Sequence, residues 1–499
     1  MTTTDAVPTA TGATPTTFES LDPRTGAVVG EHPIHDAAHV QRAVETARAE
    51  ATWWRDLGFD GRKAHLASWR KVIAQRMDEL AAVMSRETGK PAGDSLLEIA
   101  LAVDHLAWAG GHAQKVLKRR SVSPGFLMVN QAASVEYRPL GVVGVIGPWN
   151  YPVFTPMGSI AYALAAGNAV VFKPSEYTPG VGEWLAATFL ETVGRPVFQV
   201  VTGFGETGAA LCAADVDKVA FTGSTATGKR VMAACAETLT PVVIEAGGKD
   251  ALLVDEDAAL PAAAEAALWG ACANAGQTCA GVERVYVHER VYDDFLAELL
   301  AQAKTVRAEE GGQVGPITMP KQIDVIRRHI DDAIARGGKA LIGGPEAVGE
   351  RFVQPTVLVD VPEDSAAVQE ETFGPTVTVR KVKDMDEAVE LANATSYALG
   401  STVFSKSHGM EIAQRLRVGM TAINGVISFA GIPTLPFGGV GDSGFGRIHG
   451  PDGLREFTYP HAIARQRFKP AIALTSFKRT EKQEGQLVKV TKALYGRGK

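Results

Sequence analysis

A chain of 499 residues exceeds the size at which one hydrophobic core usually stops growing, so two or more domains are expected. Its composition, 45% hydrophobic and 21% charged residues, is that of an ordinary globular protein. A net charge of −6 gives no general attraction to nucleic acid, and four cysteines are too few for a disulfide framework, which indicates a reducing compartment.

The N-terminus shows no targeting signal. Residues 1–17 have no apolar core and no Arg, so they are expected to be a disordered lead-in rather than a secretory or transit peptide. No run approaches the ~18 apolar residues of a membrane span, and a cytoplasmic protein is expected. Cys272 and Cys279 have no His beside them, so no metal site is expected.

The first part of the folded chain is predicted to be helical. Over residues 40–116 apolar side chains such as Leu66, Trp69 and Ile73 recur at three- and four-residue spacing. Residues 121–138 then suggest two short strands, and we expect a projecting hairpin there that serves assembly.

Strands and helices then alternate. Five apolar, β-branched runs with helical stretches between them are predicted to be buried parallel strands. They occupy residues 141–147, 169–175, 196–201, 218–223 and 241–247. Such alternation is typical of a doubly wound α/β domain, which binds ligands outside the carboxyl ends of its strands.

A second α/β set is predicted after Gly248. It contains a long Ala-rich helix over residues 260–274, the loop that carries Cys279, and a helix over residues 291–307. Further strands lead to the Gly-rich segment 436–447. The predicted fold class is therefore α/β, with two doubly wound domains and a small β element.

Cys279 is the first candidate for chemistry. Most unpaired Cys residues are buried small hydrophobes, so the residue by itself indicates little. Here it lies in AGQTC, where small neighbours let the backbone turn tightly and leave the thiol facing a cavity.

Three strand ends could hold a dinucleotide. FTGSTATG, residues 221–228, ends a strand and opens a helix whose N–H groups can face a pyrophosphate. GFGETG, residues 203–208, matches a Gly-rich fingerprint only weakly, and a simple turn is an equal interpretation. In KPSE, Lys173 and Glu176 can hydrogen-bond ribose hydroxyls, although a surface ion pair is the commoner meaning of such residues. Glu176 would also repel a 2′-phosphate, which favours NAD over NADP.

Seven motifs occur in one order along the chain: PWNYP (148–152), KPSE (173–176), FTGST (221–225), EAGGK (245–249), GQTC (276–279), EETFGP (370–375) and PFGGVGDSGFGR (436–447). Together they resemble the aldehyde dehydrogenase superfamily over residues 18–461. The resemblance implies an aldehyde dehydrogenase-like fold and an NAD-dependent oxidation of an aldehyde to its carboxylic acid, with NADP possible as cofactor. It also implies a homodimer or homotetramer.

The resemblance also implies catalytic roles. Cys279 would be the nucleophile that forms a thiohemiacetal and then a thioester. Glu245 would activate the water that hydrolyses the thioester, and its apolar setting should raise the pKa of its carboxyl group. The side-chain amide of Asn150 and the N–H of Cys279 would stabilise the oxyanion. Lys249 is placed near Glu245 and is given a possible role in orienting that acid.

The cofactor contacts implied by the resemblance come from four segments. Glu371 would bind the nicotinamide ribose, with the rings of Phe373 and Trp149 beside the nicotinamide. The complete predicted set is Trp149, Lys173, Ser175, Glu176, Gly205, Phe221, Thr222, Gly223, Ser224, Gly228, Glu371 and Phe373. Phe154, Trp269 and Phe429 are expected to line the substrate tunnel.

The corresponding domains divide the chain as follows. The NAD-binding Rossmann-like domain is predicted at 18–120 and 139–247, the catalytic domain at 248–447, the oligomerisation element at 121–138 and 460–475, and a basic tail at 476–499.

The chain departs from the family pattern at its C-terminal end. Many members continue the Gly-rich motif as Gly-Arg-Glu, whereas Ile448 stands here, so hydrolysis should depend on Glu245. The segment 447–457 suggests the class 3 and related branches. Residues 465–499 carry ten Lys or Arg and two Glu, and Leu487, Val490 and Leu494 share one helical face. Such a segment can rest on an anionic membrane but is more often solvated or a partner contact. The apolar residues 471–474 and Phe477 could instead pair with the 121–138 hairpin.

Alternative functions remain open from the sequence. One is an NADP-preferring semialdehyde dehydrogenase, and another is a non-catalytic NAD-binding member, although both Cys279 and Asn150 are present. CoA-acylating relatives generally lack a base at the position of Glu245, which argues against that chemistry. Binding of nucleic acid through the basic tail would be salt-dependent, and none is expected.

Overall fold

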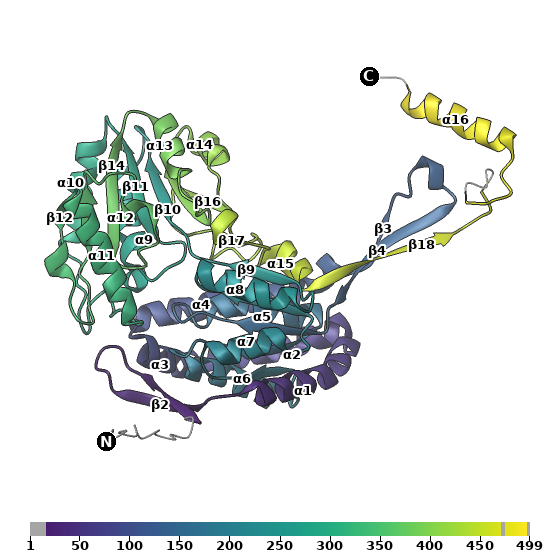
Figure 1. The fold of residues 1–499 in the computed structure, drawn as a ribbon, viewed down its shortest axis with the longest axis horizontal. Helices are drawn as coiled ribbons and strands as arrows, with labels where there is room; N and C mark the ends of the chain where they lie inside the picture. Colours follow the sequence, from purple (N-terminus) through teal and green to yellow (C-terminus); the bar gives the residue numbers. More distant parts are fainter. Residues whose placement is uncertain (1–15, 471–474, 497–499) are drawn as a thin grey trace, which may run out of the picture. The chain divides into compact units, whose positions relative to one another are not determined.

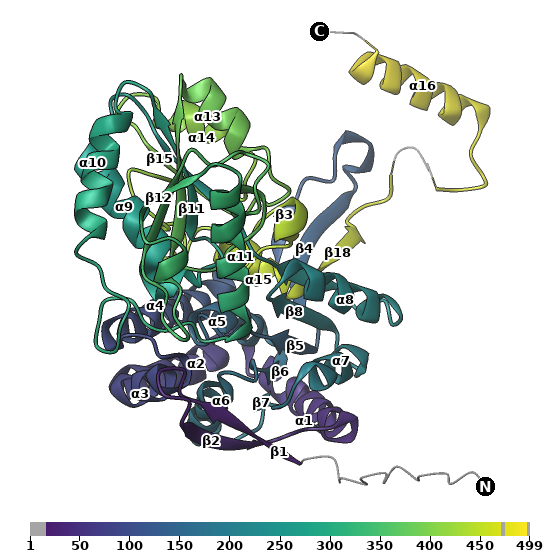
Figure 2. The ribbon, with the colours of Figure 1, turned by 60° about the vertical axis from the view of Figure 1, so that its left-hand side comes forward.

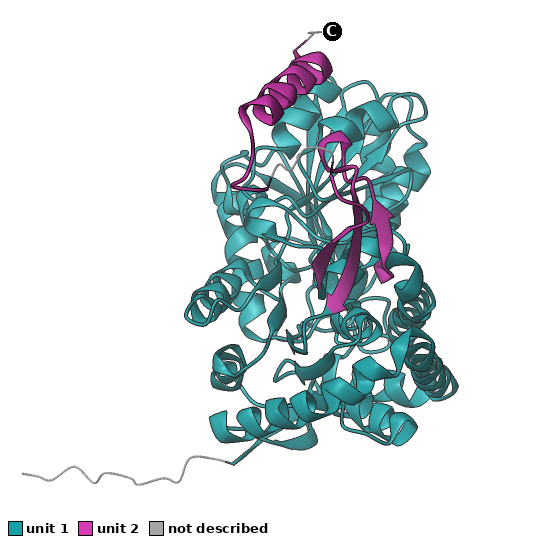
Figure 3. Ribbon diagram, turned by 90° about the vertical axis from the view of Figure 1, so that its right-hand side faces the viewer, with its two compact units in different colours: residues 1–116, 139–458 teal, residues 117–138, 459–499 magenta. Residues whose placement is uncertain are grey.

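The computed structural model describes residues 16–470 and 475–496. The chain divides into two compact units, one formed by residues 1–116 and 139–458 and the other by residues 117–138 and 459–499 (Figure 3). Of the predicted lead-in only residues 16 and 17 are described, and Thr17 already begins strand β1.

A six-stranded sheet forms the first layer of the larger unit. Its order is β17-β9-β8-β5-β6-β7, and all neighbours are parallel except β17 against β9. The strands are β5 (Val142–Ile146), β6 (Ala169–Lys173), β7 (Phe198–Val200), β8 (Lys218–Thr222), β9 (Val242–Glu245) and β17 (Gly444–Phe445). The central strands are buried on both faces, which explains their continuous apolar runs.

Helices cover both faces of this sheet (Figure 2). Crossover helices carry the chain from β5 through α5 (Phe154–Ala166) to β6 and through α6 (Pro179–Val193) to β7. The chain then returns through α7 (Gly205–Ala213) to β8 on the other side of β5, and through α8 (Thr225–Ala236) to β9. The order therefore reverses between β5 and β8, where open α/β sheets bind their ligands.

The N-terminal segment packs around this sheet. A hairpin of β1 (Thr17–Leu21) and β2 (Val28–Pro33) precedes four helices. The helices are α1 (Ala37–Asp56), α2 (Gly58–Gln75), α3 (Met77–Thr88) and α4 (Ala92–Leu117). Leu66, Trp69 and Ile73 are buried on α2, as their spacing predicts.

A seven-stranded sheet begins directly after β9. Its order is β12-β13-β14-β11-β10-β15-β16, parallel except for β12 against β13. The strands are β10 (Asp250–Val254), β11 (Val282–His288), β12 (Lys339–Ile342), β13 (Thr356–Val359), β14 (Thr376–Val382), β15 (Gly400–Phe404) and β16 (Met420–Ile423).

Helices flank the second sheet as well (Figure 1). They are α9 (Leu260–Cys272), α10 (Tyr292–Ala303), α11 (Lys321–Ala335), α12 (Ala366–Gln369), α13 (Met385–Ala392) and α14 (Gly409–Arg415). The chain finally returns to the first sheet, where β17 pairs with β9 and α15 (Gly450–Glu456) packs on α5.

The smaller unit contains a three-stranded sheet of order β18-β4-β3. Strands β3 (Arg120–Val122) and β4 (Gln131–Pro139) are the predicted hairpin, and β18 (Thr458–Gln466) lies beside β4. Phe477 was an alternative partner of this hairpin, but it lies in a turn and is fully exposed, because β18 already occupies the edge of β4. Residues 471–474, the other proposed partner, fall outside the described residues.

The basic tail forms helix α16 (Glu481–Tyr495), which begins with a capping box between Thr480 and Gln483. Over the described ranges, the structure contains no helix of the length and apolar character that crossing a membrane requires.

Candidate active site

The loop before β11 holds Cys279 in a sharp turn. Residues Asn274, Ala275 and Gly276 all have left-handed backbone angles, with φ of 52°, 55° and 71°. A Cβ atom at Gly276 would lie 2.1 Å from the carbonyl group of Gly374, so only glycine fits there. The small residues of AGQTC thus allow the close passage of two backbones.

The thiol of Cys279 faces the carboxylate of Glu245 at the end of β9. The Sγ–H donates to Oε1 of Glu245 at 3.6 Å, and Thr222 Oγ1 donates to Oε2 at 3.1 Å. Burial raises the pKa of Glu245 to about 7, as its apolar setting predicts. Loss of solvent and the nearby carboxylate of Glu245 hold the pKa of Cys279 well above its usual value. The site therefore pairs a protonated thiol with a carboxyl group that changes between its neutral and ionised forms near pH 7.

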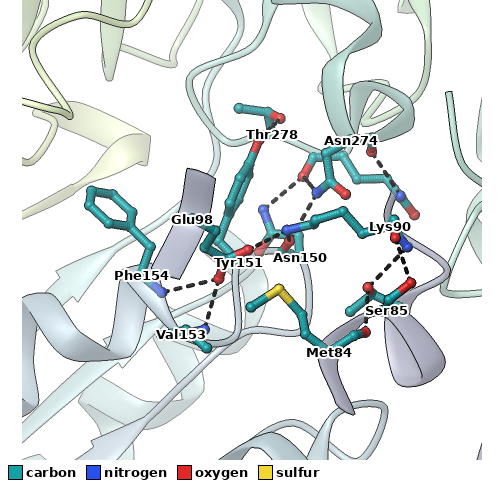
Figure 4. Close-up of polar contacts among 12 residues, drawn as sticks. Met84, Ser85, Lys90, Glu98, Asn150, Tyr151, Val153, Phe154, Asn274 and Thr278 are labelled. Carbon is teal, nitrogen blue, oxygen red and sulfur yellow. Dashed lines mark hydrogen bonds and ion pairs between the residues drawn. The ribbon is translucent and has the colours of Figure 1, made fainter. Parts of the chain in front are cut away.

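Asn150 lies in the loop after β5 and is fixed by several hydrogen bonds (Figure 4). Its Nδ2 donates to the carbonyl oxygen of Gln277 at 2.8 Å. The backbone carbonyl oxygen of Asn150 accepts hydrogen bonds from Lys90 Nζ and from Asn274 Nδ2, both at 2.9 Å. A carboxamide has two N–H donors, and the contacts of the described residues use one of them.

A buried ion pair supports Asn150, and no local pattern in the sequence indicates it. Lys90 and Glu98 are 0% and 1% exposed and pair directly. Glu98 Oε1 also accepts from the backbone N–H of Val153 at 2.8 Å and of Phe154 at 3.1 Å (Figure 4). The pair thus ties the start of α4 to the loop that carries Asn150.

Lys249 was given a possible role in orienting Glu245, but its contacts in the structure are to other residues. Its ammonium group pairs with Glu283 and donates to Thr372 Oγ1 at 3.1 Å. Glu245 ends β9 of the first sheet, whereas Lys249 directly precedes β10 of the second, so the two side chains enter different layers.

Residues at the end of β6 form a polar edge next to β5. Lys173 Nζ lies 3.7 Å from Glu176 Oε2, and Ser175 Oγ donates to the same oxygen at 3.2 Å. Lys173 is buried, whereas the Glu176 side chain is 37% exposed and open to a ligand.

The β8–α8 turn supplies the start of a helix beside this edge. Ser224 is the N-cap of α8, and its Oγ accepts from Thr227 N at 3.3 Å. A Cβ at Gly228 would lie 3.0 Å from Ile244, so Gly228 brings α8 close to β9. Phe221 is buried under this turn, and a Cβ at Gly223 would meet its ring at 2.7 Å.

Two further segments contain predicted cofactor residues: the Glu371–Phe373 segment before β14 and the start of α7. Glu371 Oε1 accepts from Gly248 N at 3.1 Å, and loss of solvent together with nearby Glu283 raises its pKa to about 8. Phe373 has φ of 51° and its ring meets Trp149 edge-on, with centroids 5.6 Å apart. Gly205 is the first residue of α7, with open space around it.

This donor set fits a dinucleotide. A helix N-terminus offers N–H groups to a pyrophosphate, and Lys173 and Glu176 offer partners to ribose hydroxyls. The N-terminus of α8 and the Lys173–Glu176 pair both follow the carboxyl ends of strands, β8 and β6. These strands flank β5, next to the point where the strand order reverses.

A cavity of about 240 Å³ opens beside Cys279 and Glu245. Phe154 and Trp269 line it, as expected from the sequence. Phe429 is not among its lining residues, because its ring turns toward Gly400, where an added Cβ would lie 2.9 Å from it.

Comparison with known proteins agrees with this geometry. The Aldehyde dehydrogenase family model matches residues 10–463. A 4,4'-diapolycopene aldehyde oxidase of Methylomonas sp is 40% identical over 453 residues, covering 89% of this chain and 85% of that protein. A glutarate-semialdehyde dehydrogenase of Pseudomonas aeruginosa is 36% identical over 453 residues, covering 88% and 92%. A solved NAD-dependent aldehyde dehydrogenase from Sinorhizobium meliloti has a TM-score of 0.87 and 33% identity, over 94% and 95% of the two chains.

These relatives, with the doubly wound sheet and the thiol at its edge, indicate an oxidoreductase that works with NAD or NADP. The chain belongs to the aldehyde dehydrogenase family. Its reaction is the oxidation of an aldehyde to a carboxylic acid. The class 3 branch that residues 447–457 suggested is not confirmed by these relatives.

Proposed function

We propose that Cys279, Glu245 and Asn150 carry out the aldehyde oxidation as nucleophile, general base and oxyanion donor. The contact of 3.6 Å between Sγ of Cys279 and Oε1 of Glu245 supports this assignment most directly. Glu245 removes the thiol proton, and Sγ forms a bond to the aldehyde carbon while the carbonyl electron pair moves to oxygen. The free N–H of the Asn150 amide donates to that oxyanion.

The second half of the reaction uses Glu245 again. With a dinucleotide held beside Trp149 and Phe373, its nicotinamide would supply the acceptor for the hydride that leaves the former aldehyde carbon. Cys279 then holds a thioester, and Glu245 releases the thiol proton to solvent. The ionised Glu245 takes a proton from water as the water oxygen attacks this group. The carbon–sulfur bond breaks with its electron pair going to sulfur, Glu245 returns a proton to that sulfur, and the carboxylic acid is released. A carboxyl pKa of about 7 suits a base that must gain and lose protons at neutral pH.

The proposed cofactor site consists of the three strand ends and the Glu371–Phe373 segment. The N-terminus of α8 with Ser224 would hold the pyrophosphate, and Lys173 with Glu176 would hold the adenosine ribose. Because the Glu176 carboxylate would repel a 2′-phosphate, NAD is the preferred cofactor. Glu371 would bind the nicotinamide ribose, beside the rings of Phe373 and Trp149.

The proposal includes self-association through the smaller unit. Phe126, Leu127, Met128 and Val129, at the tip between β3 and β4, are 40–61% exposed. Such a contiguous apolar group suits burial against a second copy in a homodimer or homotetramer. A cytoplasmic location fits the free thiol that the mechanism needs, and all four cysteines are free.

The assignment is tested by aldehyde-dependent reduction of NAD, followed by absorbance of the reduced nicotinamide. Cys279→Ala should abolish turnover while NAD still binds. Cys212→Ala, at a buried cysteine away from the cavity, is the matched control and should keep turnover. Turnover retained in Cys279→Ala would refute the assignment.

A further inference from the structure

The cavity beside Cys279 continues to the surface along an apolar path. Leu97 and Trp269 line it and are 50% and 44% exposed, so they form its mouth. Taking Cys279 as the nucleophile, as proposed above, we infer that the substrate is an uncharged, apolar aldehyde whose chain fills this path, and that aldehydes with a second carboxylate are poor substrates.

The wall of the cavity is built from large apolar side chains. Leu101 comes from α4, Phe154 from α5 and Val426 from the loop after β16, with Phe437 and Ile448 from the C-terminal segment. Ile448 stands where many family members have a carboxylate, so this part of the wall is apolar as well. Each methylene group that such a wall removes from water strengthens binding about fourfold.

The cavity offers no cation to a second carboxylate. Among its lining residues Lys90 is the one Lys or Arg, and it is already paired with Glu98 and bonded to the carbonyl oxygen of Asn150. Asp94 and Glu245 also line the cavity. A substrate carboxylate would therefore lose its hydration and meet acids of the same sign.

His449 does not supply a positive charge to the cavity either. It lines the cavity, is fully buried, and packs on His105 with ring centroids 3.9 Å apart. Burial and His105 keep the pKa of His449 well below its usual value, so the imidazole is neutral. Neither ring nitrogen has a partner among the described residues, and a neutral ring gives no charge with which to hold a carboxylate.

The test compares two aldehydes of equal length, hexanal and 6-oxohexanoate, with NAD and the wild-type enzyme. We expect kcat/KM for hexanal to exceed that for 6-oxohexanoate by at least about tenfold. We also expect kcat/KM to rise along the series from propanal to octanal. An equal or reversed ratio, or no turnover of either compound, would overturn the inference.

Substitutions of residues that line the cavity test the same substrate preference. Leu101→Arg introduces a guanidinium group into the cavity and should shift the ratio toward 6-oxohexanoate by about tenfold or more. Leu97→Arg, at the exposed mouth, is a second variant in case the first does not fold. Leu190→Arg on the exposed side of α6 is the matched control and should leave the ratio unchanged. A ratio that stays the same in both cavity variants would contradict the inference.

The outcome for Cys279→Ala is independent of this ratio. If that variant keeps turnover, the proposed mechanism fails whatever the substrate. If it loses turnover while wild type prefers 6-oxohexanoate, the mechanism stands and the substrate class fails.

Discussion

At the scale of single residues, the proposed mechanism depends on a carboxyl group whose surroundings set its proton affinity. Glu245 is 4% exposed and has one hydroxyl and one thiol as hydrogen-bond partners, with a pKa of about 7. A surface Glu would be ionised throughout the neutral range and would be a weaker base.

This environment predicts the pH dependence of hydrolysis. Glu245 acts as a base only when it is ionised. If hydrolysis of the thioester limits the rate, kcat should therefore fall as pH drops below about 7 and level off above about 7. Glu245→Gln should lower kcat at least about 10²-fold and remove this dependence. A wild-type kcat that is constant between about pH 6 and 8 would contradict the role of Glu245.

Glu176 predicts the choice of cofactor. Glu176→Ser removes the charge beside the ribose, so kcat/KM for NADP should rise about tenfold or more relative to NAD. Kinetics with each cofactor at saturating aldehyde measure the change. Glu183→Ser, on a neighbouring helix, is the control. An unchanged NADP/NAD ratio in Glu176→Ser would show that this carboxylate does not face the ribose.

At the scale of elements, the junction of α3 and α4 holds the catalytic loop through Lys90 and Glu98. Both side chains are buried, and removing one leaves the other as an unpaired charge. Lys90→Met should therefore lower the free energy of unfolding by about 3–5 kcal/mol, measured by urea denaturation.

The double variant provides the control for this prediction. In Lys90→Met/Glu98→Gln no charge is buried, and the Gln carbonyl can still accept from the N–H groups of Val153 and Phe154. Much of the lost stability should return. Equal losses in the single and double variants would mean that packing, and not the unpaired charge, sets the cost.

The sequence predicted the elements that local patterns encode. Continuous apolar runs predicted β5, β6, β8 and β9, because a strand buried on both faces needs no polar side. Helix α11 was not predicted, although Ile323, Ile326 and Ile330 give the spacing of a buried helical face.

Tertiary placements were harder to predict. The Lys90–Glu98 pair has no local signal, because its partner, the Asn150 loop, lies 60 residues beyond Lys90 in the chain. The contacts of Lys249 with Glu283 and Thr372 were not predicted, because the chain changes sheets between β9 and β10, which a count of residues does not reveal. Phe429 was misplaced because its direction depends on packing against Gly400. These contacts follow from the fold and not from the motifs.

At the scale of the whole molecule, assembly can be tested at the hairpin of the smaller unit. Phe126→Ser/Val129→Ser removes two exposed apolar side chains from the tip without touching the site. If the tip is buried between copies, light scattering should show a smaller assembly than for wild type. Leu239→Ser, at an exposed turn of the larger unit, should leave the mass unchanged. Identical masses for wild type and the double variant would place the interface elsewhere.

The central claim is that a thioester forms on Cys279 and that Glu245 is needed to hydrolyse it. Intact-protein mass spectrometry of Glu245→Gln, after reaction with NAD and hexanal, tests it most directly. The account predicts that one reduced nicotinamide per subunit forms, more slowly than in wild type because Gln cannot take the thiol proton, together with an added acyl mass that peptide mapping locates on Cys279. Full multiple turnover in this variant, or an acyl group on Cys212, Cys235 or Cys272 instead, would contradict it.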